Sequence, residues 1–310
     1  MRIAIVTTSW PETDEDPAGH FVRTSARVLE RQGHEVKVVT PRAGGAFGWP
    51  GSTVRLRQRP LRAVEAMHWV LAASGEVARL NADMVVAHWA VPCAWPIGIA
   101  GSARLEVVSH GGDVRLLAAL PRPARYRVAS AIASRAATWT FVSDALRREL
   151  LGSLEGSARE HVERVARVSA PPLELPDVRD AVRRLRGELG ATRAAVSVGR
   201  LVASKRVDRA IEHVARTHDV DVLVVVGDGP ERARLEKLAR ARGVDARFVG
   251  AVGRSTALAW IGAAEELLHA SAAEGLSTVV REAEALGTRV VQLPLSLTAC
   301  SGDRRRRRSS

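Results

Sequence analysis

The sequence predicts an α/β protein made of two doubly wound, Rossmann-like domains in tandem. Three observations support this class. The 310 residues suit two domains of ordinary size, short β-branched runs alternate with longer amphipathic stretches, and the alternation pauses near the middle of the chain. Each set of elements opens with a strand, a loop and a helix. Both halves are therefore expected to form parallel sheets covered by helices.

The first set of elements is expected between residues 2 and 142. Arg2–Thr7 is interpreted as a buried strand, because the apolar run is too short for a signal peptide and no small-residue cleavage site follows it. The first helix is expected from His20 to Gln32, with Gly33 as a C-cap signal. The other expected strands are Val36–Thr40, Met84–His88, Leu105–Ser109 and Thr138–Val142, and the other helices are Met67–Leu80 and Arg125–Ala137.

The region from Leu151 to about Arg193 differs, with clustered prolines and few long apolar runs. We therefore expect one Rossmann-like domain over residues 1–168, a second over 169–296, and a disordered basic tail over 297–310. The second domain's expected strands are Ala194–Val198, Val222–Val226, Ala246–Val249, Leu267–Ala270 and Arg289–Leu293, and its helices are Val207–Arg216, Glu231–Arg242, Thr256–Ala264 and Thr278–Leu286.

The charge, the cysteine count and the lack of long apolar runs limit which classes of function the protein can have. The net charge is +12 and the pI about 11.1, which could indicate nucleic acid, anionic lipid or anionic small ligands as partners. Arginine supplies nearly all of the positive charge. The only two cysteines, Cys93 and Cys300, exclude a disulfide framework or zinc cluster, so we expect no metal. No apolar run approaches the ~18 residues of a spanning helix, so a cytoplasmic protein is expected.

Two segments of the second domain could bind an anionic ligand. Gly199, Arg200 and Lys205 lie on a loop between a strand and a helix, where two cations can face one diphosphate. The alternative is two solvated cations in a surface loop. Glu274 and Glu282 stand eight positions apart across a loop-to-helix junction, where they could hold sugar hydroxyls. The alternative is a capped helix with exposed acids.

The first domain offers His110, at the carboxyl end of an expected strand, where it could donate a hydrogen bond or shuttle a proton. The alternative is a loop histidine bonded to backbone, and His88 is a weaker candidate of the same kind. Gly19 would let backbone approach a phosphate. Because ligands bind outside the carboxyl ends of parallel strands, we expect the site in the cleft between the domains.

Two patterns are set aside. Gly227 and Gly229 begin like a dinucleotide fingerprint, but the third glycine is missing and the segment falls in the middle of its domain. Asp14–Asp16 and Asp219–Asp221 resemble metal-binding pairs, but we interpret both as solvated acids at turns.

Taken in order, these segments resemble glycosyltransferase family four, the large GT-B group of retaining glycosyltransferases, over about residues 1–295. Each piece is weak alone, but the ordered set is specific. It comprises the Gly19 loop, Gln32-Gly33-His34-Glu35-Val36, His110-Gly111-Gly112-Asp113, Phe141-Val142-Ser143, Gly199-Arg200 with Lys205, Val226-Gly227-Asp228-Gly229-Pro230, Phe248-Val249-Gly250, and Glu274 with Glu282.

The resemblance implies a nucleotide-diphosphate sugar as donor and a hydroxyl acceptor on a glycan or glycolipid precursor. It makes residues 1–168 the acceptor-binding domain and residues 169–296 the nucleotide-sugar-binding domain. Arg200 and Lys205 would stabilise the leaving diphosphate, and Glu282 would hold the ribose. Glu274 and His110 would contact the donor sugar. The resemblance implies no cofactor and no metal. The remaining implied donor-binding residues are Gly19, Gly199, Val249, Gly250, Leu276, Ser277 and Thr278.

The end of the chain departs from the family pattern. After Leu295 no further donor loop or closing helix follows, and five arginines, Arg304 to Arg308, stand before the last two serines. We interpret this end as the product of a frameshift or an early stop, which leaves the second domain incomplete. The alternative is a basic arm that binds nucleic acid or membrane.

Three other functions are weighed against a transferase. They are a nucleotide-sugar epimerase or hydrolase on the same fold, a truncated non-catalytic remnant, and a nucleic-acid-binding protein. The last has no recognisable motif, so we do not expect nucleic acid as a partner. The arginines with Trp10, Trp49, Trp89 and Trp95 would suit a lipid-linked acceptor and peripheral contact with an anionic inner membrane face.

Overall fold

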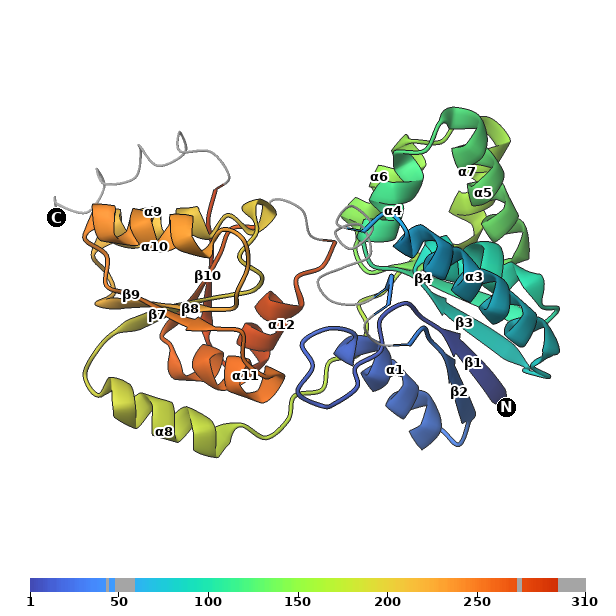
Figure 1. Cartoon of the computed structure of the whole chain (residues 1–310). Helices are drawn as coiled ribbons and strands as arrows, with labels where there is room; N and C mark the ends of the chain where they lie inside the picture. The colour runs from blue at the N-terminus through green and yellow to red at the C-terminus, as the bar shows by residue number, and fades with distance from the viewer. Residues whose placement is uncertain (43–44, 48–58, 272–274, 295–310) are drawn as a thin grey trace, which may run out of the picture. The chain divides into compact units, whose positions relative to one another are not determined.

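The computed structural model describes residues 1–42, 45–47, 59–271 and 275–294. The chain divides into two compact units, Met1–Glu174 and Leu175–Ser310 (Figure 1). The boundary expected from sequence stood six residues earlier, after residue 168. The expected basic tail, Arg304 to Arg308 within it, and the residues Trp49, Glu274 and Cys300 lie outside the described residues.

Unit 1 contains a parallel six-stranded sheet in the order β2-β1-β3-β4-β5-β6. Strands β1 and β3 are almost completely buried, because helices cover both faces of the sheet. The strands are β1 (Arg2–Val6), β2 (Glu35–Val39), β3 (Met84–His88), β4 (Arg104–Ser109), β5 (Ala136–Phe141) and β6 (Ala166–Val168).

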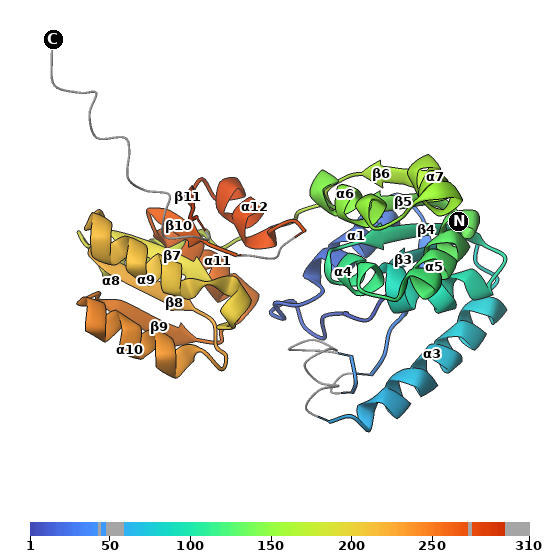
Figure 2. The same cartoon turned by 90° about the horizontal axis from the view of Figure 1, so that it is seen from above.

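The helices of unit 1 follow the alternating pattern. They are α1 (His20–Arg31), α3 (Arg62–Arg79), α4 (Gly112–Ala118), α5 (Arg122–Arg135), α6 (Asp144–Gly152) and α7 (Gly156–Val165), with short turns η1 (Ala90–Ile97) and η2 (Gly98–Ala100). Val22 and Ala26 bring α1 onto Ile3, Ile5 and Val86 of the sheet. Helix α3 lies at the margin of the unit (Figure 2).

Unit 2 contains a parallel five-stranded sheet in the order β11-β10-β7-β8-β9. Its strands are β7 (Ala194–Val198), β8 (Val222–Val226), β9 (Ala246–Gly250), β10 (Glu266–His269) and β11 (Arg289–Gln292). Its helices are α8 (Arg179–Leu189), α9 (Val207–Thr217), α10 (Arg232–Arg242), α11 (Arg254–Ala263) and α12 (Thr278–Ala285), with the turn η3 (Ala203–Lys205).

Two apolar clusters cover the two faces of this second sheet. On one face, Leu185 of α8 and Leu258 of α11 pack with Val224 of β8. On the other face, Ile211 of α9 and Leu235 of α10 pack with Val225. Adjacent residues of β8 therefore point into different layers, as a strand buried on both faces requires.

Each strand and helix expected from sequence is present, with ends shifted by a few residues. Three details were wrong. Helix α3 begins at Arg62 rather than Met67, α4 and α6 were not expected, and the region after Leu151 carries more structure than its composition indicated. There, α7, β6 and α8 were missed because they are rich in charged residues and have few apolar ones. In α8, for example, only Leu185 and Leu189 are buried.

Candidate functional site

Three loops meet at the carboxyl edge of the sheet in unit 2, and glycines let their backbones touch. The N–H of Gly199 donates to the carbonyl of Val226 at 2.9 Å, and the N–H of Gly227 donates to the carbonyl of Gly250 at 2.8 Å. A Cβ on Gly227 would lie 1.9 Å from the Gly199 oxygen, and a Cβ on Gly229 would lie 2.4 Å from the Leu201 oxygen. We call Gly199, Gly227, Gly229 and Gly250 the glycine junction.

The junction explains the glycine spacing that resembled a dinucleotide fingerprint. Gly227 and Gly229 are required by the neighbouring loop after β7, which occupies the space of their missing side chains. Gly227 also has φ +132° and Gly250 has φ +87°, conformations that favour glycine.

Lys205 is the last residue of η3, and its side chain lies next to Gly199 of the glycine junction. Its Cε and Cδ would lie 3.7 and 3.9 Å from a Cβ placed on Gly199, so the structure brings these two predicted residues together. Arg200 follows Gly199 directly, and both cations are half-buried. Burial lowers the pKa of Arg200, yet a guanidinium stays protonated at neutral pH. Partial removal from water strengthens its attraction for an anion.

The loop before α12 has the capped start that the sequence predicts. The hydroxyl of Ser277 accepts a hydrogen bond from the N–H of Val280 at 3.5 Å, and Leu276, Ser277 and Thr278 are all half-buried. This cap leaves other first-turn N–H groups of α12 for solvent or a ligand. Glu274, expected on the same loop, lies outside the described residues.

Glu282 is buried in α12 and forms an ion pair with Arg254 of α11. Nη2 of Arg254 lies 2.9 Å from Oε1 of Glu282, and the two side chains are 11% and 7% exposed. Burial raises the pKa of Glu282, while the positive charges of Arg254 and Arg281 act in the opposite direction. The sequence analysis did not find Arg254, because no local pattern marks an arginine whose partner is 28 residues away.

Val249 and Gly250 end β9, where a register shift places Gly250 opposite Val226. The side chain of Arg232 lies against this end of the strand and donates to the carbonyl of Phe248 at 3.2 Å. A Cβ on Gly250 would stand 3.4 Å from Nη1 of Arg232. Arg232 thus supports the backbone that the sequence analysis expected to meet the nucleotide.

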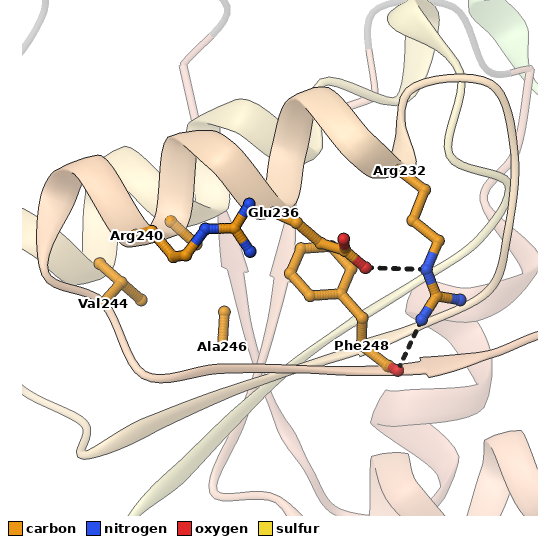
Figure 3. Close-up of a pocket in the computed structure, with 7 residues that line it drawn as sticks. Arg232, Glu236, Arg240, Val244, Ala246 and Phe248 are labelled. Atoms are coloured by element: carbon orange, nitrogen blue, oxygen red, sulfur yellow. Dashed lines mark hydrogen bonds and ion pairs between the residues drawn. The ribbon is translucent and has the colours of Figure 1, made fainter.

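A cavity of about 280 Å³ lies between α10 and β9 in unit 2. Arg232 and Glu236 form an ion pair at 2.9 Å on its wall, next to Phe248 (Figure 3). The other labelled lining residues are Arg240, Val244 and Ala246. No residue predicted to bind the donor lines this cavity among those that the structure describes.

In unit 1, a buried carboxylate joins the loops that follow two adjacent strands. Asp113 accepts hydrogen bonds from the N–H groups of His110 at 3.1 Å and Gly111 at 3.0 Å through Oδ1. Its Oδ2 accepts from Ala90, after β3, at 2.8 Å. Asp113 is 3% exposed, and it stands within the Gly-Gly-Asp motif that the sequence analysis quoted without giving this residue a role.

His110 lies in an aromatic environment made by α1 and the two loops. Its ring centroid is 4.6 Å from Phe21 and 5.1 Å from Trp89. Nε2 of His110 lies 3.0 Å from Nδ1 of His88, and their ring planes differ by 11°. Burial lowers the pKa of His110 to about 3 and holds that of His88 well below its usual range. Both rings are therefore neutral at physiological pH.

Gly19 begins α1 with φ 79°, and a Cβ there would lie 2.6 Å from the carbonyl oxygen of Ser9. Its own carbonyl accepts from Val22 at 2.9 Å. Arg23 holds the preceding loop through Asp14, at 2.8 Å, and by lying over the ring of Trp10. The close approach at Gly19 is thus made by backbone of this chain.

The predicted residues fall into two groups. His110 and Gly19 belong to unit 1, and the other described ones to unit 2. Within residues 1–42, 45–47, 59–271 and 275–294, no three His, Cys, Asp or Glu side chains gather as a metal site would require. No helix in these same ranges is long and apolar enough to cross a bilayer.

A parallel sheet with helices in each of two tandem units is the arrangement of the GT-B fold. Residues 180–295 match the family described as glycosyl transferases group 1. This second part of the chain therefore resembles glycosyltransferases. A comparison of the sequence with curated proteins gives no match.

Several solved structures share the fold. Sucrose-phosphate synthase from Thermosynechococcus elongatus has a TM-score of 0.65 at 18% identity, and Anabaena Alr3699/HepE, solved with UDP and glucose, has 0.60 at 18%. WaaG, a glycosyltransferase involved in lipopolysaccharide biosynthesis, has 0.59 at 21%. Each alignment covers 94% of this chain and 80% of the other chain.

Proposed function

We propose that the chain transfers a sugar, with retention of configuration, from a nucleoside-diphosphate sugar to a hydroxyl acceptor. The observation that carries the proposal is the placement of Lys205 over Gly199, on the loop that also carries Arg200, at the carboxyl edge of the sheet in unit 2. Ligands bind at this edge of parallel sheets, and two cations on one loop match the charge of a diphosphate.

The cations supply the electrostatic part of the reaction. Negative charge develops on the diphosphate as the glycosidic bond breaks, and fixed positive charge nearby lowers the energy of that transition state. Arg200 offers a planar fork for two oxygens, and Lys205 adds a point charge. In this mechanism the two side chains do the work for which other transferases use a metal ion, so we propose that none is needed.

The remaining contacts are assigned by residue type and placement. Gly199, Val249, Gly250, Leu276, Ser277 and Thr278 present backbone to the nucleotide and diphosphate, because glycine and a capped helix start leave backbone groups accessible. Glu282 holds the ribose hydroxyls. His110 and Glu274 hydrogen-bond the donor sugar.

A thermal-shift titration with a panel of nucleoside-diphosphate sugars tests the donor site. A ligand that binds the folded state raises the melting temperature with concentration. We expect a selective shift that is lost in Arg200→Gln and in Lys205→Met, and kept in the control Lys237→Met. No shift with any donor would contradict the proposal.

Product analysis then separates the enzyme classes. Transfer to an added acceptor supports a transferase, and the anomeric configuration of the product tests retention. Donor turnover without acceptor would instead indicate a nucleotide-sugar epimerase or hydrolase. Binding without any turnover would indicate a non-catalytic remnant.

We also propose that the protein works in the cytoplasm, in peripheral contact with an anionic membrane that carries a lipid-linked acceptor. The supporting feature is on α3, where Leu61, Val64, Met67 and Leu71 are 60–84% exposed along one face. Trp10 and Trp89 do not extend this surface, because they are half-buried against Arg23 and His110.

Co-sedimentation with vesicles tests this contact. We expect binding to vesicles containing phosphatidylglycerol, weaker binding to pure phosphatidylcholine, and loss of binding in the double variant Met67→Glu, Leu71→Glu. The control Leu116→Glu changes an exposed leucine on α4 and should bind as the wild type does. Equal binding by both variants would refute a role for α3.

A further inference from the structure

His88 and His110 share a single hydrogen bond between ring nitrogens. Nδ1 of His88 lies 3.0 Å from Nε2 of His110, which requires one proton between them. Both rings are neutral, since burial depresses their pKa values, so each ring carries one proton in total. Two arrangements satisfy these conditions, and they differ in which ring donates.

The surroundings of His88 distinguish the two arrangements. His88 is 2% exposed, and its Nε2 is buried without a hydrogen-bond partner among the described residues. If His110 were the donor, the proton of His88 would sit on this Nε2 as a buried, unpartnered N–H. If His88 is the donor, Nε2 carries only a lone pair. A buried orphan donor is rarer and costlier than an under-used acceptor, so the second arrangement is favoured.

The nearby carboxylate does not change this assignment. Both carboxylate oxygens of Asp113 accept hydrogen bonds from backbone N–H groups, those of Ala90, His110 and Gly111. It positions the backbone that carries His110 but makes no hydrogen bond to the ring in the described part of the chain. Orientation of the His110 ring therefore depends on His88 and on contact with Phe21 and Trp89.

We infer that His88 is a positioning residue that donates Nδ1–H to Nε2 of His110 and so holds His110 in its Nδ1–H tautomer. His110 keeps part of its surface exposed and uses Nε2 for His88, so Nδ1–H is the group it offers to a ligand. It would donate to a hydroxyl oxygen of the donor sugar. This last step rests on the proposed function, whereas the tautomer does not.

The tautomer can be measured without any substrate. In the full chain labelled with 15N-histidine, a long-range 1H–15N correlation spectrum distinguishes protonated from bare ring nitrogens, and His110→Asn identifies the signals of His110. We expect His110 to be protonated at Nδ1 in the wild type. Protonation at Nε2 in the wild type would overturn the inference, whatever the variants do.

Two variants of His88 test the cause. His88→Phe removes the donor, and His110 should then redistribute its proton between its nitrogens. His88→Asn places an amide N–H as many bonds from the backbone as Nδ1, and should restore the Nδ1–H tautomer. An unchanged tautomer in a folded His88→Phe protein would show that His88 does not set it.

Kinetics with a donor identified by thermal shift complete the test. We expect kcat to fall about 10-fold in His88→Phe with little change in KM, and His88→Asn to recover most of the loss. The predicted tautomer together with no donor binding would refute the proposed function and leave the inference standing. The predicted tautomer with equal kcat in all three proteins would confine His88 to a structural role.

Discussion

Arg254 and Glu282 form a nearly buried ion pair between α11 and α12, with nitrogen and oxygen 2.9 Å apart. Glu282 is also the carboxylate that we propose binds the ribose of the donor. A ribose hydroxyl can donate to a carboxylate oxygen while the guanidinium remains on the other, because a carboxylate accepts several hydrogen bonds at once. Arg254 therefore favours the ionised form of Glu282, against the effect of burial on its pKa.

Replacement of Arg254 by methionine should destabilise the protein by about 3 kcal/mol, because it leaves a buried carboxylate without this counter-ion. The pKa of Glu282, already raised by burial, should rise further in the folded variant. A folded state that binds the proton more tightly loses stability as pH rises from the ordinary carboxyl value to the raised one. The deficit should thus be larger at about pH 7.5 than at about pH 5.

Urea unfolding at both pH values measures this deficit. Arg179→Met is the matched control, since Arg179 pairs with Asp177 on the surface with both side chains largely exposed. It should behave as the wild type at either pH. A deficit in Arg254→Met that does not depend on pH would show that lost packing, rather than charge, is responsible.

Gly227→Ala should destabilise unit 2 by about 3 kcal/mol or more, because the new Cβ would overlap the carbonyl oxygen of Gly199 and φ is +132°. Gly187→Ala is the control. Gly187 lies inside α8, where an added Cβ meets nothing within 4 Å, so this change should stabilise by about 1 kcal/mol. Thermal unfolding of both variants would give shifts of opposite sign, and a tolerated Gly227→Ala would contradict the close contact at the glycine junction.

Asp113→Asn should destabilise unit 1 by about 2 kcal/mol. The carboxylate accepts hydrogen bonds from three backbone N–H groups. In asparagine, the NH2 group would replace one of the two oxygens and would face a backbone N–H, which is also a donor. The control, Asp221→Asn, changes an exposed carboxylate that accepts from the N–H of Arg193, and should have little effect. Chemical unfolding checks both, and equal stability of the two variants would mean that Asp113 is not needed to join the loops.

Arg200→Lys should reduce kcat/KM about 100-fold for the donor, although the charge is kept, because an ammonium cannot bind two oxygens of a diphosphate in a planar fork. The control is Arg216→Lys, on the exposed face of α9, where the side chain donates to a carbonyl of its own helix. Steady-state kinetics with saturating acceptor measures the ratio. A loss below twofold would exclude Arg200 from direct contact with the diphosphate.

The strand pattern made most of the fold predictable. Strands such as Val222–Val226 are continuous apolar runs, and buried parallel strands have this character because both faces are covered. The region after Leu151 was harder. Helices α7 and α8 carry many charges on their outer faces, and their burial depends on partners distant in sequence, so composition indicated only a domain boundary.

The residues of the candidate site likewise differ in how well the sequence indicates them. Gly199, Lys205 and Ser277 were found because a loop glycine, a nearby cation and a helix cap are local signals. Arg254 and Phe21 were missed, since each acquires its role from a residue on another element. His88 was considered a weaker candidate because its strand end alone does not reveal that the next strand brings His110 to 3.0 Å.

The glycine junction also bears on how donor preference could be changed by design. At Gly227 and Gly229, the space of the missing side chain is already filled by backbone of the neighbouring loop, so neither position tolerates substitution independently of the others. Libraries that randomise these positions would mostly yield unfolded clones. Diversity is better placed at Leu276 and Thr278, which flank the N-cap residue Ser277 and are only half-buried.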